Sequence, residues 1–507
     1  MRKLLVKYAV LCVVLLLVGC SKEAEYSKVI PSDVDVVATF DCQRMIAESG
    51  MLSDDATDSQ KQLIESFKKE LSAGETELFD EILADPNSVG IDWSQKVYGF
   101  IQSNSRITAF VLSVTDAEKL KAACLAFGGS QIRGRKFTQE DGFSWARTRK
   151  MDIAINDKAC ILVTSAGSEK IQALKERIAS WLSQEKEQSF VSTKYHKMLL
   201  DLDGEVGLYA SMTALPENAS MMASMAYTKD VDISSVKYLV DVAFEKGQLV
   251  AHGQVLYEDS KFRDWMKSQE DACKTLDAKS LKALPLSTPL WFGVGIDGNT
   301  FYNHLLEHPT YGKELQNMSL PLDIEGVIRS IDGDFAVAYP SGIFVDVKNN
   351  EILKICVGAI KTMGRFIGLD LNEIADDQYE VVDLNHSVSR LLGKDAQLHI
   401  GMKDDTFYLL TDGTENKELS KDESLAAAPW ADEVDDNTLF LAFNFCDGMN
   451  LVDRYSRSKQ QSKMLRNYFD YLTYSQKNIE KNKIILSFVD KDRNVIEQLI
   501  EFYAQMN

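Results

Sequence analysis

An ordered internal repetition constrains the fold of this chain more than any other feature of its sequence. The segments INDKACILVT (155–164) and MKDDTFYLLT (402–411) have the same length, and each reads as a strand, a polar turn and a second strand. Four more pairs resemble each other in the same order along the chain: 31–41 with 285–297, 114–124 with 347–356, 205–211 with 438–444, and 235–257 with 467–489. The alternative is that two unrelated α+β domains share this strand–turn–strand texture.

The strands come as adjacent hairpins rather than in strict alternation with helices, which favours antiparallel sheets. Apolar residues spaced three or four apart indicate amphipathic helices around 171–181 and 496–503. We therefore expect an α+β fold of two similar tandem domains, each an antiparallel sheet with helices packed on one face. The repetition predicts a first domain over residues 31–275 and a second over 276–507.

The first twenty residues, MRKLLVKYAVLCVVLLLVGC, have the pattern of a secretory signal. Three basic residues precede an apolar run that is too short to span a bilayer. The run ends in Leu17-Val18-Gly19-Cys20, which resembles the bacterial lipoprotein box, where the cysteine sulfur is acylated before cleavage. We expect residues 1–19 to be the signal peptide, Cys20 to carry the lipid, and 20–30 to be a lipidated tether.

The tether leads into Val29-Ile-Pro-Ser-Asp-Val-Asp-Val-Val-Ala-Thr-Phe-Asp41. This opening, with Gly90-Ile-Asp-Trp-Ser94 and Ser330-Ile-Asp-Gly-Asp-Phe-Ala-Val337, resembles a Bacteroidetes lipoprotein family that is defined only as a domain of unknown function. The resemblance covers nearly the whole mature chain and implies no functional residue. Ser21, with no aspartate there, is typical of an outer-membrane lipoprotein, and Lys22 to Glu25 resembles an acidic surface-export tag, on the periplasmic or the cell-surface side.

Composition excludes some classes of partner. The net charge of −20 falls to −23 when the three basic residues of the signal are removed. A chain this acidic has no electrostatic footprint for nucleic acid. The six cysteines that would remain (Cys42, Cys124, Cys160, Cys273, Cys356 and Cys446) form no C-x-x-C pair, which argues against a cysteine zinc site or a redox motif. We expect core cysteines, with one or two disulfides as the alternative.

The stretch FGVGIDGNTFYNHLLEHP (292–309) matches two motifs at once. Gly293, Gly295 and Gly298 fit the G-x-G-x-x-G of dinucleotide-binding proteins, which needs a long helix and then a parallel strand. Here fewer than ten residues separate Asn299 from Pro309, and no clear parallel strand follows. We therefore expect glycines that allow close packing or a bend in a strand, and no dinucleotide cofactor.

The same stretch contains H-x-x-E-H at His304, Glu307 and His308. This motif resembles that of the inverzincin peptidases, which implies two histidine ligands, a glutamate base, and Glu373 or Glu380 as a third ligand. Pro309 disfavours helical geometry at His308, so the alternative is two solvent-facing histidines at a helix end, where a protonated imidazole suits the helix dipole. We favour that alternative and expect no metal.

No other catalytic motif is present. We expect a non-catalytic lipoprotein of the outer membrane that binds an envelope protein or glycan and is held to the membrane by its lipid. The alternatives are a zinc hydrolase that uses His304, Glu307 and His308, and a carbohydrate-handling accessory lipoprotein that presents exposed tryptophans.

Overall fold

The structure, a computed structural model, forms two compact units, Met1–Ala210 and Ser211–Asn507. This division lies earlier in the chain than the boundary after residue 275 that the repetition predicts. The predicted signal peptide 1–19 and Cys20 lie outside the described residues. Those residues are 25–53, 56–69, 71–128, 131–165, 171–214, 233–308, 311–317, 323–383, 398–411, 419–455 and 459–506.

The first unit is built on an antiparallel sheet in which the strands pair in the order β8-β1-β2-β3-β7-β6-β5-β4. Valine, isoleucine and aromatic residues fill these strands, as their side-chain shape favours. The bounds are β1 Val36–Phe40, β2 Val97–Gln102, β3 Ile107–Ser113, β4 Thr138–Glu140, β5 Phe143–Arg147, β6 Asp152–Ile155, β7 Ala159–Ser165 and β8 Val206–Ser211.

The helices of this unit are α2 Cys42–Glu48, α3 Asp58–Lys69, α4 Ala73–Ala84, α5 Ala117–Gly128, α6 Ile171–Ser183 and α7 Lys194–Leu200. The apolar stripe predicted around 171–181 is buried at Leu174, Ile178 and Trp181 of α6. The Trp181 ring meets Phe100 of β2 edge-on at 5.3 Å. Burial of such aromatic surface ties α6 to the sheet.

The chain enters the first unit through a short 3-10 helix, η1 (Glu25–Val29). Tyr26, Val29 and Ile30 are buried. The Tyr26 hydroxyl donates to the Lys96 carbonyl at 2.5 Å, and the Phe190 N–H donates to the Ile30 carbonyl at 2.9 Å. Residues 25–30, which were predicted to belong to the tether, are therefore part of the folded unit because these apolar side chains are buried.

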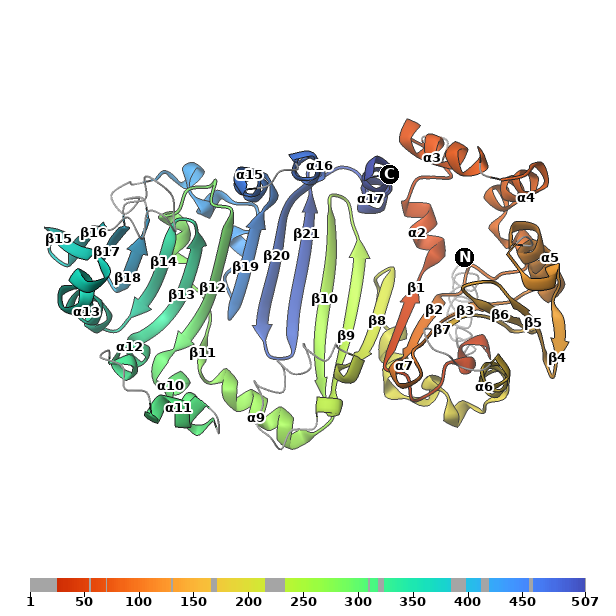
Figure 1. Ribbon diagram of the computed structural model, residues 1–507, viewed down its shortest axis with the longest axis horizontal. Helices are drawn as coiled ribbons and strands as arrows, with labels where there is room; N and C mark the ends of the chain where they lie inside the picture. Colours follow the sequence, from red (N-terminus) through yellow and green to blue (C-terminus); the bar gives the residue numbers. More distant parts are fainter. Residues whose placement is uncertain are drawn as a thin grey trace, which may run out of the picture. The chain divides into compact units, whose positions relative to one another are not determined.

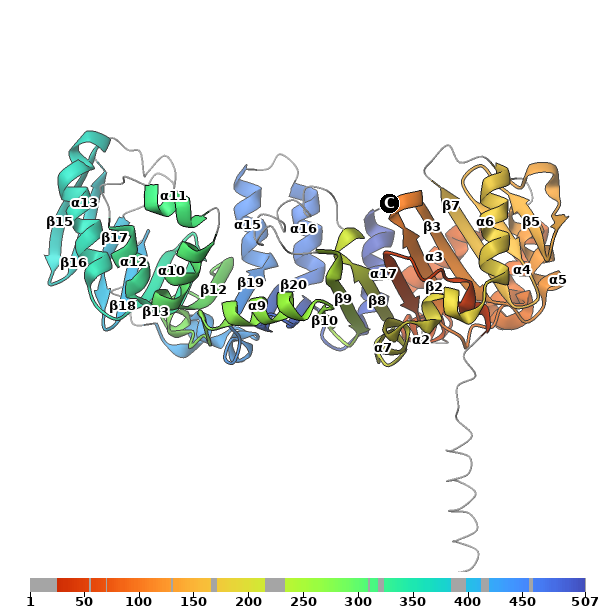
Figure 2. The same ribbon diagram turned by 90° about the horizontal axis from the view of Figure 1, so that it is seen from below.

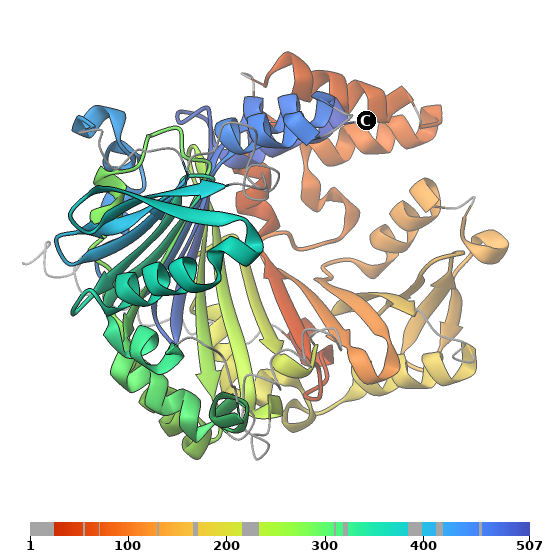
Figure 3. The same ribbon diagram turned by 60° about the vertical axis from the view of Figure 1, so that its left-hand side comes forward.

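The second unit contains a larger antiparallel sheet, with pairing order β9-β10-β21-β20-β19-β12-β13-β14-β18-β17-β16-β15 and the short β11 beside the end of β12. Figure 3 shows this sheet curving along its length. The bounds are β9 Val236–Phe244, β10 Gln248–Tyr257, β11 Cys273–Lys274, β12 Leu290–Asp297, β13 Ile331–Tyr339, β14 Gly342–Val347, β15 Leu369–Ala375, β16 Gln378–Asp383, β17 Leu398–Lys403, β18 Thr406–Leu410, β19 Leu439–Asn444, β20 Phe469–Asn478 and β21 Lys481–Phe488.

Helices of the second unit lie along both ends of its strands (Figure 1): α15, α16 and α17 at one end, and α9, α10 and α11 at the other. Figure 2 shows α15 and α16 side by side. The bounds are α9 Ser260–Glu270, α10 Gly298–Glu307, α11 Tyr311–Asn317, α12 Ile324–Ser330, α13 Glu351–Ile367, α15 Phe445–Tyr455, α16 Lys459–Tyr468 and α17 Val495–Met506.

One face of the second sheet is covered by the irregular segments that contain η9 (Lys279–Lys282) and η11 to η13 (within Lys421–Glu433). Trp291 of β12, Phe440 of β19 and Ile485 of β21 point into this layer, where Leu284 and Trp430 meet them. The opposite face receives α13 over β14, β17 and β18, and the helices α15 to α17 near the ends of β9, β10 and β21.

The sequence repetition reappears as a repeated order of pairing. In the first unit β1 lies between β8 and β2, and the sheet continues through β3, β7, β6, β5 and β4. In the second, β12 lies between β19 and β13, and the sheet continues through β14, β18, β17, β16 and β15. The predicted class, α+β with antiparallel sheets in two similar tandem domains, is confirmed.

The hairpin β9–β10 belongs by sequence to the first repeat, but β10 pairs along its length with β21, the last strand of the second repeat. Ala251 lies opposite Ile484, and these residues are in turn the hairpin partners of Val242 and Tyr474. The hairpin is therefore part of the second compact unit. Among the described residues, no helix is both long and apolar enough to cross a membrane.

Candidate functional site

Three aspartates of the second unit bring their carboxylates together although they are distant in the sequence. Asp277 precedes η9, Asp334 lies in β13, and Asp346 lies in β14, and their oxygens are all within 4.8 Å of one another. Asp334 faces the core because it alternates in step with the buried Ala336 and Ala338 of β13. Among the residues that the structure describes, this is the one group of three or more histidine, cysteine or acidic side chains that meet so closely.

The carboxylates of this cluster are hydrogen-bonded. Asp334 accepts from the backbone N–H of Asp277 at 3.2 Å and of Ala278 at 2.8 Å. Asp346 accepts from the Thr406 hydroxyl at 2.6 Å. The Lys279 ammonium lies 2.7 Å from an Asp277 oxygen and 3.4 Å from an Asp346 oxygen, so a cation of the chain itself offsets part of the negative charge of the group.

Burial governs the protonation of the cluster. Asp334 and Asp346 are each 5% exposed. Desolvation, together with the charges of Asp277 and Asp346, raises the pKa of Asp334 to about 7. The hydrogen bond that Lys279 donates to Asp277 raises the pKa of Lys279. Lys279 offsets one of the three negative charges, and protonation of Asp334 below about pH 7 offsets a second, so the chain itself compensates most of the charge and we assign no metal to the cluster.

No sequence motif marks this cluster. Its one readable signal was a charge inside the apolar strand pattern at Asp334, on the side of β13 that alternation assigns to the core. The acidic runs that the sequence displays more openly lie elsewhere. A search for charged residues at predicted core positions would have found Asp334 and Asp346, but only the fold brings Asp277 to them.

The H-x-x-E-H motif lies at the end of α10. The helix ends at Glu307, and His308 has the extended backbone angles φ −67° and ψ 126°. The His308 Nδ1 accepts from the Tyr311 N–H at 3.3 Å, and the two ring centroids lie 4.5 Å apart with the rings tilted by 32°. His308 therefore positions the start of α11, and both His304 and His308 are half-buried rather than solvent-facing as expected.

His304 and Glu307 remain on α10, where Glu307 is exposed. Within the described part of the chain, these side chains and His308 belong to no group of three potential ligands, and neither do Glu373 of β15 and Glu380 of β16. The structure thus does not bring the residues of the predicted zinc alternative together.

The three glycines of the G-x-G-x-x-G pattern are explained by close packing. Gly293 and Gly295 lie inside β12, which is antiparallel to both of its long neighbours, so the βαβ unit of a dinucleotide site is absent here. A Cβ on Gly293 would lie 2.9 Å from Cζ2 of Trp291. Gly295 lies against the backbone of Lys274, and Gly298 lies against the backbone of Ile328. These contacts agree with the expectation of packing glycines.

An apolar row crosses the face of the second sheet that lies away from η9 and η11 to η13. Each member lies directly opposite the next one on the neighbouring strand, in the spatial order β9, β10, β21, β20, β19, β12 and β13. All are partly exposed, up to 38% at Ile484, and among the described side chains none packs against the buried clusters. We call this set the open apolar row: Val242, Ala251, Ile484, Tyr474, Leu441, Phe292 and Val337.

The open apolar row is wide. Its seven strands span six interstrand steps of about 4.8 Å, or roughly 29 Å. Packed regions bound it: α9 covers Tyr238 and Val255 on one side, and α16 and α17 cover Phe244 and Leu249 on the other. A contiguous, partly exposed apolar surface of this extent is typical of an interaction site.

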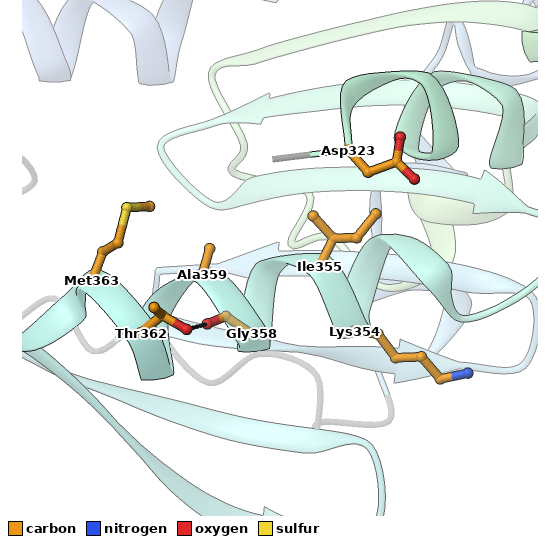
Figure 4. A pocket seen from close by; sticks show the side chains of 7 residues that line it. All are labelled: Asp323, Lys354, Ile355, Gly358, Ala359, Thr362 and Met363. Atoms are coloured by element: carbon orange, nitrogen blue, oxygen red, sulfur yellow. Dashed lines mark hydrogen bonds between the residues drawn. The ribbon is translucent and has the colours of Figure 1, made fainter. Parts of the chain in front are cut away.

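A pocket of about 250 Å³ lies on the solvent side of α13. Figure 4 shows Ile355, Ala359 and Met363 projecting from one side of this helix, with Asp323 of the adjoining α12 segment opposite. The Thr362 hydroxyl donates to the Gly358 carbonyl at 2.7 Å. The small residues Gly358 and Ala359 leave this space, which Asp323, Lys354 and Thr362 line together with apolar side chains, and we assign no ligand to it.

Two further expectations concern tryptophan and cysteine. All six tryptophans are described and none is exposed, since Trp181, Trp291 and Trp430 are buried and the other three are half-buried. The exposed aromatic platform that would favour carbohydrate binding is therefore not observed. The six cysteines after Cys20 are all free. Cys160 is buried, as a core cysteine would be, whereas Cys273 and Cys446 are exposed, so the expectation of core cysteines is met for only part of the set.

No curated protein matches this chain. Among solved structures, crystal form IV of TP0453 is similar at 11% identity and a TM-score of 0.26, over 45% of this chain and 79% of that one. Crystal form I of TP0453 gives 8% identity and a TM-score of 0.28, over 49% and 86%. Likeness of this degree carries no argument about function. The model of a family described as a domain of unknown function, DUF4836, matches residues 26–496, and the chain therefore belongs to the DUF4836 family.

Proposed function

We propose that this protein is a lipoprotein of the bacterial outer membrane that binds an envelope protein and performs no catalysis. The observation that carries the binding role is the open apolar row. Its width suits a protein partner better than a small ligand, because small-molecule sites are concave pockets that enclose most of the ligand. The core of a protein interface is a patch of aromatic and aliphatic side chains of this kind.

The anchor is supported by the sequence that ends in Cys20 and by the short distance along the chain from Cys20 to Glu25, where the folded unit begins. A chain of net charge −23 is repelled by anionic headgroups. The acyl chains therefore supply the membrane affinity, at about 0.8 kcal/mol per buried methylene.

Two experiments test the proposal. Growth with labelled fatty acid should label the native protein and leave the Cys20→Ser variant unlabelled, and equal labelling of both would contradict the anchor. For binding, a photo-crosslinking residue at Tyr474 in the open apolar row is compared with one at Tyr503, which is 61% exposed on α17. A discrete cross-linked protein at Tyr474 and none at Tyr503 supports the row. Identical products at both positions refute it.

A further inference from the structure

The start of the first unit is fastened to one end of its sheet. Glu25 pairs with Lys28 at 3.1 Å and with Lys158 of the turn between β6 and β7. The carbonyl of Lys28 accepts a hydrogen bond from the side-chain amide of Gln184. Tyr26 is buried immediately after Glu25. Glu25, the first described residue, is therefore fixed beside the β6–β7 turn.

Covalent geometry limits how far Cys20 can be from this point. Five residue steps separate Cys20 from Glu25, and a fully extended chain covers at most about 3.6 Å per step, or roughly 18 Å. A lipid on Cys20 would thus keep the membrane interface within about that distance of Glu25. Because 18 Å is smaller than the diameter of a small domain, roughly 30 Å, only one end of the first unit can face the bilayer at close range.

The β6–β7 turn is suited to this position. Its backbone is rigid, since Asn156 Oδ1 accepts from the N–H of Lys158 at 2.9 Å and of Ala159 at 2.8 Å. Lys158 is 62% exposed. Lys28 and Lys158 balance Glu25 and Asp157, so the residues of η1 and of this turn together carry no net charge.

We infer that the surface formed by η1 and the β6–β7 turn, with Lys28 and Lys158, is the membrane-facing surface of the first unit, and that its partner is the lipid headgroup layer. This inference rests on the proposed acylation of Cys20. It adds an orientation that the anchor alone does not specify: β6 stands with its Ile155 end toward the lipid and its Asp152 end away from it.

The test uses the full acylated protein in vesicles that contain a lipid with an amine-reactive ester on a short headgroup spacer. Lys158 is compared with Lys150, an exposed lysine in the turn at the opposite end of β6. Peptide mass spectrometry measures how much of each lysine becomes linked to lipid. Lys158 should be modified several-fold more than Lys150, and the two should react equally with a soluble ester.

A variant with about twenty Gly/Ser residues inserted after Ser21 is the control for the tether. Lengthening the tether from five to about twenty-five residues lowers the effective concentration of the surface at the membrane roughly tenfold, so the preference for Lys158 should largely disappear. Equal modification of Lys150 and Lys158 in the native, fatty-acid-labelled protein overturns the orientation and leaves the anchor intact. Failure of fatty-acid labelling overturns both.

Discussion

Replacement of Gly293 by alanine tests whether the glycine pattern of β12 serves packing. Gly293 lies beneath the indole of Trp291, two residues earlier on the same strand. An alanine Cβ there would lie 2.9 Å from Cζ2 and 3.1 Å from Cζ3 of the ring. The indole cannot readily move aside, because its Nε1 donates to Ser280 Oγ at 3.1 Å and Trp430 stacks against it.

The expected magnitude follows from two opposing effects. Overpacking of a fixed ring costs about 1–3 kcal/mol, whereas replacing a strand glycine by alanine recovers about 0.5–1 kcal/mol of backbone entropy. Gly293→Ala should therefore destabilise the second unit by about 1–2 kcal/mol. In a Trp291→Leu background, which itself costs up to about 3–5 kcal/mol, the clash is gone and Gly293→Ala should be neutral or slightly stabilising. The coupling free energy is then about 2 kcal/mol.

Native-state hydrogen exchange of peptides from β12 and β13 measures this stability locally, which avoids assuming that two compact units unfold together. Gly358→Ala on α13 is the matched control. Its added Cβ meets nothing within 4 Å, so helix propensity should make that variant up to about 1 kcal/mol more stable. An equal cost of Gly293→Ala with and without Trp291, or no cost at all, would refute the packing explanation.

Three further predictions concern other parts of the second unit. The folded-state pKa of Asp334, about 7, exceeds its ordinary value, so its stabilising contribution is full below pH 4 and is lost as pH rises through 7. The Asp334→Asn variant does not titrate at this position, so between pH 4 and pH 8 its free energy of unfolding should gain up to about 4 kcal/mol relative to the native protein. Denaturation midpoints measured across this pH range check the prediction. Gly247→Ala should cost about 1–3 kcal/mol in urea unfolding, because φ is +68° and the new Cβ would lie 2.6 Å from the Lys491 Cα; unchanged stability would contradict this. His304→Ala should leave the zinc content of the purified protein unchanged by elemental analysis, and loss of a stoichiometric zinc would show that the H-x-x-E-H alternative is correct.

Much of the fold was predictable because it rests on local patterns. Strand–turn–strand segments such as 155–164 and 402–411 are hairpins, as two apolar runs on either side of a polar turn predict. The segment 171–181 is helical because its apolar residues repeat at helical spacing and bury one stripe. Similar segments in the same order fold into the same pairing order, since the residues that pair are those that were duplicated.

The unit boundary was less accessible from the sequence, because it depends on which strands pair across the repeats. Backbone hydrogen bonds between strands carry little sequence information, so the pairing of β10 with β21 could not be inferred from either strand alone. The repetition places residues 235–257 with the first copy. In the structure, seven consecutive pairs between Gln248–Gln254 and Lys481–Ser487 bind this hairpin to the second copy, and the compact units divide after Ala210.

One candidate site could be judged from the sequence, and another could not. The unfavourable position of His308 could be inferred from Pro309 alone, since the residue before a proline avoids helical geometry, and the structure gives it an extended backbone. The open apolar row could not be inferred. Its residues alternate along each strand as core residues do, and only the packing of the covering segments decides which face stays partly exposed.

The junction between β10 and β21 explains why the row continues across the two repeats. Ala251 and Ile484, the hairpin partners of the equivalent residues Val242 and Tyr474, pair with each other, so the antiparallel strands β10 and β21 are related by a two-fold axis normal to the sheet. Rotation about such an axis keeps each face on its own side, and Val242 and Tyr474 therefore line the same face. The register irregularity between Gln476 and Asn478 makes this possible. Without that extra residue in β20, the pairing of β20 with β21 would shift by one residue, and Ile484 would point to the face opposite Tyr474.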